Sequence, residues 1–193
     1  MPLLKDGRMV DDPWVAVADD GAPPVAEQVI VTLERWRESR DRLLQRNGRL
    51  GIRLRSDQSP ALIADDLAHF DLVALEFPVF RDGRAFSYAR LLRERHGFTG
   101  EVRATGDLLR DQFVFMQRCG FDAFEVADHT AVDGWRQAMA EISVWYQPAG
   151  DRRPWVGPLR HRRPPPASGD RRDRSEHGDA GAALAPTLST AAE

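Results

Sequence analysis

Residues 73–126 decide the fold, and they read VALEFPVFRDGRAFSYARLLRERHGFTGEVRATGDLLRDQFVFMQRCGFDAFEV. Short apolar runs in this stretch end at Gly, Asp or Arg, and each leads into a segment whose apolar residues have helical spacing. A switch from strand-like to helix-like spacing that repeats along a chain predicts successive strand–helix units. The stretch therefore predicts an α/β fold.

The same alternation continues on both sides of this stretch. Strands are predicted at residues 50–54, 72–77, 101–104 and 123–126, and helices at residues 59–70, 85–96, 108–119 and 132–146. Four consecutive βα units predict a parallel sheet with right-handed crossovers. Because a closed barrel of this class has eight such units, we expect a sheet that resembles half of a (βα)8 barrel.

Three regions are predicted along the 193 residues. Residues 1–48 form an N-terminal strand and helix extension that packs on the core, with Thr32 as the cap of its helix. Residues 49–148 form the parallel α/β core. Residues 149–193 are rich in Pro, Gly, Ala and Arg and poor in aromatic residues, which predicts a disordered C-terminal tail.

Composition excludes several classes of protein. Residues 151–193 hold eight Arg and six acidic residues, a charge of +2, so the net charge of −3 leaves −5 on residues 1–150, and nucleic acid is not expected as a partner. No apolar run is long enough to span a membrane, and the first residues do not resemble a secretory signal, so we expect a cytoplasmic protein. Cys119 is the only cysteine, which excludes an internal disulfide.

Each predicted strand alternates apolar residues on one face with at least one charged residue on the other. Arg53, Glu76, Arg103 and Glu125 are separated by 23, 27 and 22 residues, which is about one βα unit each. Since side chains on a strand alternate between the two faces, we expect helices on one face and a row of alternating Arg and Glu on the other. Two interpretations stay open: a ligand site at the carboxyl ends of the strands, or a network of internal salt bridges.

The loop and helix after the second predicted strand are rich in arginine. Asp82-Gly83 is a turn signal, and Gly83 permits a positive φ. Arg84, Ser87 and Arg90 follow near a predicted helix N-terminus. Backbone N–H groups and guanidinium groups together suit an anion such as sulfate, phosphate or a carboxylate, although a solvated basic helix would have the same composition.

The loop after the third predicted strand contains Gly106 and Asp107. Gly106 allows a close backbone approach, and Asp107 is predicted to cap the helix at residues 108–119. Asp111 lies one turn further on, but capping already accounts for Asp107, so no metal site is expected. The chain has no nucleotide-binding or flavin-binding motif, and no cofactor is predicted.

Two strings in this region carry a resemblance to a known family. DGRAFSYARLLR at residues 82–93 and GEVRATGDLLRD at residues 100–111 are similar to the bacterial domain-of-unknown-function family 934. The resemblance extends from about Trp14 to Gln147. It implies an association with assimilatory sulfate reduction, since members are often encoded beside sulfite reductase and some are labelled oxidoreductases of sulfite reduction. It implies no catalytic residue.

Two hypotheses follow from these observations. The first is an accessory protein that binds sulfite reductase or its electron donor through the open wall and residues 81–90. The second is a small enzyme or binding protein for an anionic sulfur metabolite, in which Arg84 and Arg103 bind the anion and Glu76 or Glu101 acts as acid or base. Its site would be built across a homodimer. Whether the protein is an enzyme stays open.

Overall fold

The computed structural model describes residues 2–17, 27–126 and 131–141. The strands are β1 (Leu3–Lys5), β2 (Arg8–Val10), β3 (Val15–Ala16), β4 (Gln28–Thr32), β5 (Arg49–Leu54), β6 (Leu72–Phe77), β7 (Glu101–Gly106) and β8 (Ala123–Glu125). The α-helices are α1 (Leu33–Leu44), α2 (Arg84–Arg90), α3 (Phe113–Cys119) and α4 (Ala131–Glu141). Shorter helical turns are η1 (Pro60–His69), η2 (Leu91–Arg95) and η3 (Arg110–Gln112). The tail predicted at residues 149–193 lies outside the described residues.

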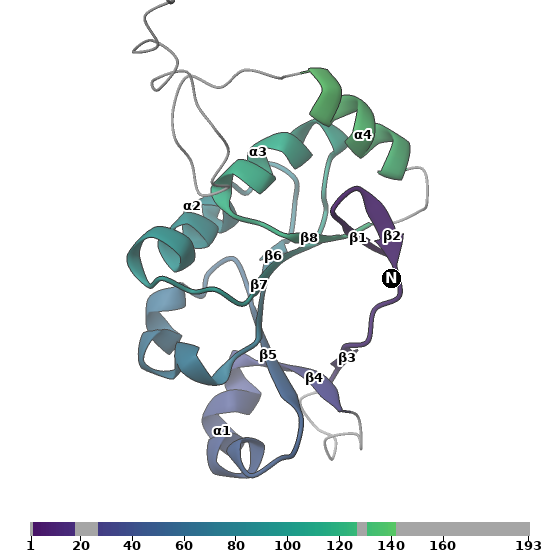
Figure 1. Ribbon diagram of the computed structural model, residues 1–193. Helices are drawn as coiled ribbons and strands as arrows, with labels where there is room; N and C mark the ends of the chain where they lie inside the picture. Colours follow the sequence, from purple (N-terminus) through teal and green to yellow (C-terminus); the bar gives the residue numbers. More distant parts are fainter. Residues whose placement is uncertain (1, 18–26, 127–130, 142–193) are drawn as a thin grey trace, which may run out of the picture. The chain divides into compact units, whose positions relative to one another are not determined.

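All eight strands belong to one curled, open sheet in the order β2-β1-β8-β7-β6-β5-β4-β3. The strands from β3 to β8 run parallel, whereas β1 pairs antiparallel with both β2 and β8. The edge strands β2 and β3 are consecutive in the chain, and residues 11–14 pass from one edge to the other across the open side of the sheet (Figure 1). The result is a half-barrel of mixed α/β type.

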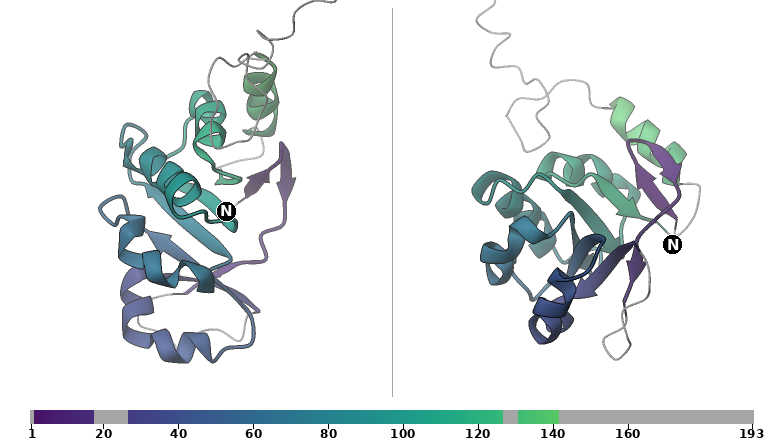
Figure 2. Two further views of the ribbon diagram at one scale, coloured as in Figure 1. Left: turned by 60° about the vertical axis from the view of Figure 1, so that its left-hand side comes forward. Right: turned by 60° about the horizontal axis from the view of Figure 1, so that its bottom comes forward.

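The helices cover the outer, convex face of the sheet, as two further views show (Figure 2). Alternate residues of β6 explain this arrangement, because Val73, Leu75 and Phe77 belong to the large core under the helices. Leu72 and Ala74 point the other way and form a small second core with Trp14 and Ile30 on the inner face. The inner face therefore has its own buried residues and is not simply a wall open to water.

The prediction of four consecutive βα units is confirmed in part. The strands β5 to β8 pair in parallel as predicted. The sheet is larger than predicted, however, because β3 and β4 extend it on one side and the hairpin of β1 and β2 extends it on the other. The hairpin turns at Asp6 and Gly7, both with positive φ (49° and 72°).

Three predicted helices differ from those observed. Residues 60–69 form a 3-10 helix, in which Ser59 accepts a hydrogen bond from the N–H of Ala61 as an N-cap. The helix predicted at residues 85–96 continues after Arg90 as a π-helical turn. The helix predicted at residues 108–119 begins only at Phe113, because Leu109 has extended backbone and a 3-10 turn follows it.

Two predicted helix boundaries are confirmed by their cap geometry. The Thr32 hydroxyl accepts a hydrogen bond from the N–H of Arg35 at 3.1 Å, and α1 starts directly after it. Gly120 ends α3 in the left-handed region, with φ of 107°. The last predicted helix is described from Ala131 to Glu141, and its remaining predicted residues lie outside the described part of the chain.

Candidate functional site

Arg103 lies at the centre of the inner face, with only 1% of its side chain exposed. Its guanidinium group donates two hydrogen bonds to Asp12, from Nη1 to Oδ2 at 2.7 Å and from Nη2 to Oδ1 at 3.1 Å. It also contacts Glu101 Oε1 at 2.9 Å and Glu125 Oε1 at 3.5 Å. Three carboxylates from three separate segments therefore surround one buried cation.

These carboxylates stabilise the charged form of Arg103. Burial by itself lowers its pKa, but the hydrogen bond with Asp12 and the negative charges of Glu101 and Asp12 act in the opposite direction. Their combined effect raises the pKa of Arg103 above its usual value. The guanidinium group is therefore charged and fully engaged with acidic side chains of the same chain.

Two further cations complete this cluster. Lys5 Nζ lies 2.8 Å from Glu101 Oε2, and Arg53 Nη2 lies 3.7 Å from Glu125 Oε2. We call these six residues the inner network: Lys5, Asp12, Arg53, Glu101, Arg103 and Glu125. It contains three cations and three anions, so its formal charge is zero. This balance favours the salt-bridge interpretation of the charges on the strands.

The sheet register differs from the predicted row of alternating Arg and Glu. Arg53 lies opposite Ala74, which lies opposite Arg103, so the two arginines share one level of the inner face. Glu76 lies one level nearer the carboxyl ends of the strands, opposite Thr105. The charges therefore occupy two levels, and Glu76 does not belong to the inner network.

Each of these two levels holds a polar atom without a partner among the described residues. Thr105 is buried, and its Oγ1 makes no hydrogen bond to any described residue. The same holds for Nε of Arg53. No hydrogen bond or ion pair joins the half-buried carboxylate of Glu76 to the rest of the described chain. A hydroxyl, a guanidinium N–H and a carboxylate on neighbouring strands suit a small polar ligand that both donates and accepts hydrogen bonds.

Arg84, the arginine of the predicted anion-binding loop, is paired with the neighbouring Asp82. Arg84 donates to Asp82 from Nε at 2.9 Å and from Nη2 at 2.6 Å, and to the Ser56 hydroxyl at 3.0 Å. The Arg84 guanidinium holds the pKa of the Asp82 carboxyl well below its usual range. Gly83 has φ of −80°, so the positive φ that its sequence position permits is not used.

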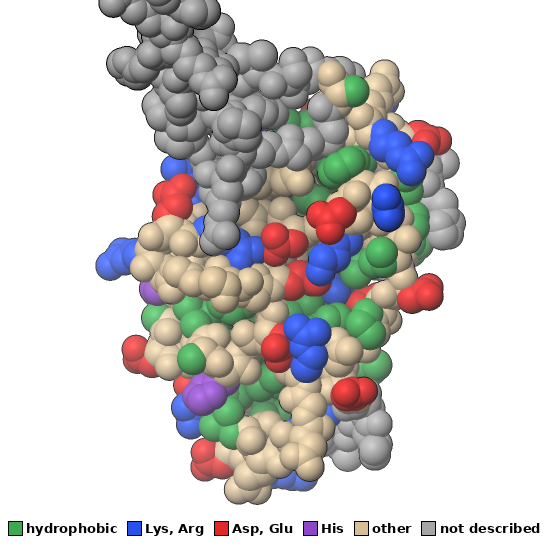
Figure 3. All heavy atoms as spheres, in the orientation of Figure 1, with side chains coloured by type: hydrophobic (Ala, Val, Ile, Leu, Met, Phe, Trp, Pro, Cys, Tyr) green, Lys and Arg blue, Asp and Glu red, His purple; other side chains and the backbone are tan. Residues whose placement is uncertain are grey.

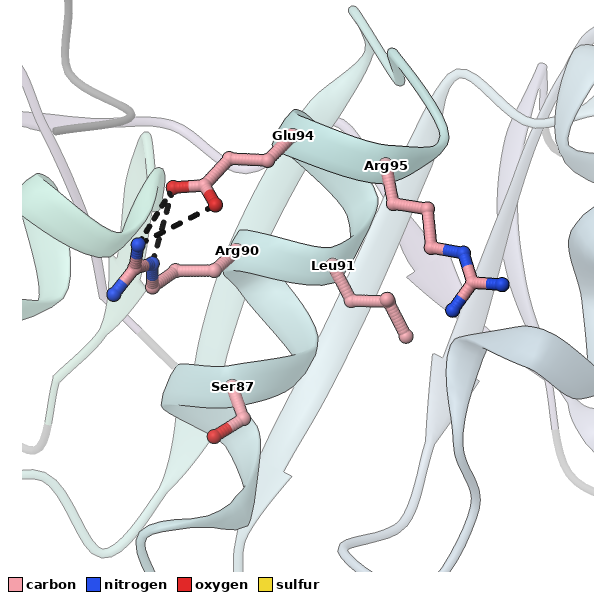
Figure 4. Close-up of a pocket in the computed structure, with 5 residues that line it drawn as sticks. All are labelled: Ser87, Arg90, Leu91, Glu94 and Arg95. Carbon is pink, nitrogen blue, oxygen red and sulfur yellow. Dashed lines mark hydrogen bonds and ion pairs between the residues drawn. The ribbon is translucent and has the colours of Figure 1, made fainter.

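Ser87 and Arg90 line a shallow depression on the outer surface of α2 and η2, together with Leu91, Glu94 and Arg95 (Figure 4). Arg90 is paired with Glu94, at 3.0 Å from Nε to Oε1. The Arg95 side chain extends to the opposite side of the helix from this pair (Figure 4). The predicted anion residues Ser87 and Arg90 thus line the same depression, but Arg90 already has a carboxylate partner.

Asp107 has a different role from the one predicted. Its carboxylate accepts a hydrogen bond from the N–H of Phe80 at 3.0 Å and does not cap a helix, since α3 starts six residues later. Gly106 has φ of 98°, and its N-terminal neighbours on β7 pair with the end of β6. Together, Gly106 and Asp107 connect the loop after β7 to the loop after β6.

The structure brings some predicted site residues together and separates others. Glu101 meets Arg103 on the inner face, and Asp82 meets Arg84 in the loop before α2. Arg84 and Arg90 belong to the helical layer, so they do not converge with Arg103 on one ligand. Acidic and basic side chains lie beside one another across this view of the surface (Figure 3).

Sequence reasoning missed Asp12 and Lys5 as members of the inner network. Asp12 is 91 residues from Arg103 in sequence, and Lys5 is 96 residues from Glu101. No local spacing connects residues so far apart. The Asp6-Gly7 dipeptide between short apolar runs was, however, a recognisable hairpin signal that would have brought Lys5 into the sheet.

Cys119 is not a candidate nucleophile. Its side chain is buried, and that burial raises the pKa of the thiol to about 11. At neutral pH the thiol is therefore protonated and covered.

In the described part of the chain, no group of three or more His, Cys, Asp or Glu side chains is placed to hold a metal ion. Among the same residues, no helix is long and apolar enough to cross a membrane.

Comparison with known proteins identifies one family. Residues 51–156 match the bacterial proteins of unknown function grouped as DUF934. This match includes most of β5 and all of β6 to β8, and thus Arg53, Glu76, Arg103 and Glu125, but it starts after Lys5 and Asp12. No curated protein matches the chain.

Proposed function

The chain belongs to the bacterial family DUF934, and from that premise we propose that it is an accessory protein of sulfite reduction in assimilatory sulfate reduction. It acts with sulfite reductase or with the electron donor of that enzyme, in the cytoplasm. The connection with sulfite reduction comes from the resemblance described above. The accessory role is supported by the residues themselves.

One observation carries the accessory role, namely the neutrality of the inner network. An enzyme for a small anion keeps a cation available in its site, because that charge binds the substrate. Here Arg103 is shared among three carboxylates, and Arg84 is held by Asp82. The predicted anion-binding arginines thus stabilise the fold or a loop, which suits a protein that acts through its surface.

The outer surface of α2 and η2 is the docking face in this proposal. Arg90 and Arg95 are exposed on two sides of this surface, with Leu91 between them, and the pairing of Arg90 with Glu94 is exposed to water (Figure 4). Exposed arginines next to small polar and apolar side chains are common at the rims of transient interfaces. They would meet acidic residues of the partner and increase the rate of association.

Growth of a deletion strain tests the pathway. We expect the strain to grow on sulfide but not on sulfate or sulfite, because only sulfide enters after the reduction of sulfite. A plasmid with the intact chain restores growth. A plasmid with Arg90→Glu and Arg95→Glu does not restore it and does not capture the reductase, since the charge of the docking face is reversed.

The matched control is the pair Arg37→Glu and Arg42→Glu on α1. Both arginines are exposed, and neither makes an ion pair with another described residue. This control is expected to restore growth and capture of the reductase. Equal growth of the deletion strain on sulfate, sulfite and sulfide would contradict the pathway assignment.

A second candidate function is a small enzyme or binding protein for an anionic sulfur metabolite, including an oxidoreductase of this pathway. It is supported by polar atoms of Arg53 and Thr105, near Glu76, that have no hydrogen-bond partner among the described residues. In this alternative the free Nε of Arg53 binds the anion. Glu76 then acts as the acid or base at the carboxyl ends of the strands.

Thermal stability in the presence of ligands tests this alternative. If it is correct, sulfite, sulfate or adenylyl sulfate raises the melting temperature by several degrees, because ligand binding stabilises the folded state. Arg53→Met removes the increase, whereas Arg37→Met leaves it in place. An unchanged melting temperature with all three ligands rules the alternative out.

A further inference from the structure

Four large apolar side chains are exposed on segments that follow the carboxyl ends of β6 and β7. Val79 and Phe80 belong to the loop after β6, Leu109 belongs to the loop after β7, and Phe115 lies on α3. Their exposed fractions are 43% for Val79, 45% for Phe80, 36% for Leu109 and 57% for Phe115. We call these four residues the carboxyl-edge patch. Apolar groups exposed in this way on neighbouring segments indicate an interaction surface.

Hydrogen bonds join the two loops that present the patch. The N–H of Phe80 donates to Asp107 at 3.0 Å, and Gln112 Nε2 donates to the carbonyl oxygen of Phe80 at 2.9 Å. Both backbone groups of Phe80 are therefore bound to the second loop. The patch is a preformed surface, so little conformational entropy is lost when a partner covers it.

Aromatic contacts support the patch from below. The ring of Phe115 lies 5.0 Å from that of Phe86, measured between centroids, and Phe86 lies 5.1 Å from the buried Phe77. Phe77 belongs to the large core under the helices. The exposed ring of Phe115 is thus the outer end of a series of tilted and edge-on aromatic contacts that continues into the core and helps to hold its position.

Two charges of opposite sign flank the patch, one on each loop. Arg81 follows Phe80, and Asp111 lies two residues after Leu109. Both are exposed, and neither makes an ion pair or hydrogen bond with another residue of the described ranges. Other charges in the same loops do have partners, since Arg84 binds Asp82 and Arg110 binds Gln137 at 2.7 Å.

We propose that a second copy of this chain covers the carboxyl-edge patch. In a two-fold symmetric interface the same surface faces itself, so the first loop of one copy lies against the second loop of the other. Arg81 of each copy then pairs with Asp111 of its partner around the apolar centre. This self-complementary charge pattern favours a second copy over an unrelated protein, which would have to supply both charges separately.

The edges of the sheet do not provide an equally good interface. The edge strands β2 and β3 have three and two residues, and residues 11–14 connect them across the open side. Short edge strands offer few free backbone groups to a second copy. The contact therefore involves the loops at the carboxyl ends of the strands and not the edges of the sheet.

The test is the molar mass of the full chain in solution over a range of concentrations, by sedimentation or light scattering. We expect a monomer–dimer equilibrium. Phe80→Asp and Phe115→Asp each raise the dissociation constant of the dimer about tenfold or more, because a carboxylate replaces an apolar contact at its centre. Leu62→Asp is the matched control: Leu62 is 50% exposed on η1, which follows β5 and carries none of the four patch residues, and its substitution leaves the dimer unchanged.

Exchange of the two charges gives the most specific result. Arg81→Asp alone and Asp111→Arg alone weaken the dimer, since each places like charges opposite one another twice. The double variant restores it, because the swapped charges are again complementary across the two-fold axis. Circular dichroism of each variant verifies that it is folded.

Three results would overturn the proposal: a monomer at every concentration, a dimer that Phe80→Asp and Phe115→Asp leave intact, or a double charge variant no better than either single one. The proposal does not depend on the role in sulfite reduction. Growth of the deletion strain tests that role, and molar mass tests this interface.

Discussion

Replacement of Arg103 by Met is expected to lower the free energy of unfolding by about 3–5 kcal/mol. The substitution keeps most of the side-chain volume but removes the cation that three carboxylates share. Asp12, Glu101 and Glu125 then have one cation fewer between them on a largely buried face. Urea unfolding followed by tryptophan fluorescence measures the change, because Trp14 and Trp36 are buried in the folded protein.

Arg37→Met is the control for this substitution. Arg37 is exposed on α1 and has no ion-pair partner in the described part of the chain, so we expect a change within about 0.5 kcal/mol. Asp12→Asn combined with Arg103→Met is expected to cost less than the sum of the two single changes, since both remove the same contact. An Arg103 variant as stable as the Arg37 variant would contradict the assignment of Arg103 to a structural network.

Gly106→Ala is expected to lower the free energy of unfolding by at least about 2 kcal/mol, because residues other than glycine are strained in its conformation. Gly106 has φ of 98°, and a Cβ atom built on it lies 2.3 Å from the carbonyl oxygen of Phe77. That oxygen also accepts a hydrogen bond from the N–H of Asp107 at 2.8 Å. The contact cannot be relieved without movement of the backbone at the ends of β6 and β7. Thermal or urea unfolding measures the loss.

Gly83→Ala is the matched control, one loop away. Gly83 has φ of −80°, and the nearest atom to a Cβ built there, Cδ2 of Phe86, is 3.9 Å away. Alanine adopts this conformation easily, so stability changes by no more than about 1 kcal/mol. Equal losses at the two positions would mean that the backbone conformation at Gly106 is not what makes glycine necessary there.

Much of the fold could be predicted from local sequence. The strand predicted at residues 72–77 matches β6. Thr32 caps the start of α1 and Gly120 ends α3, both as predicted. These features depend on apolar spacing and on the capping chemistry of single residues, which act over a few positions. The predicted start of α3 was wrong. Asp107 accepts a hydrogen bond from the backbone N–H of Phe80, 27 residues away, and therefore does not cap α3.

The candidate site was predicted less well. The charges of Arg103 and Glu101 on one face follow from the two-residue period of a strand. The partners of these two residues could not be predicted in this way, since Lys5 and Asp12 come from the first residues of the chain. The arginines of the loop and of α2 were grouped with Arg103 because they are basic, but pairing with Asp82 and Glu94 gives them separate roles.

By itself, the sequence determined the α/β class, the parallel core strands and the presence of charges on one face of the sheet. The spacing of apolar and charged residues carries this information, because strand and helix formation depends on residues that are close to one another in the sequence. Only the tertiary structure decided how the sheet ends and which charges meet. Residues 2–17 extend the sheet and cross its open side, which brings Asp12 to Arg103. An ion pair between segments 91 residues apart depends on the register and curvature of the whole sheet, and no local pattern encodes either of them.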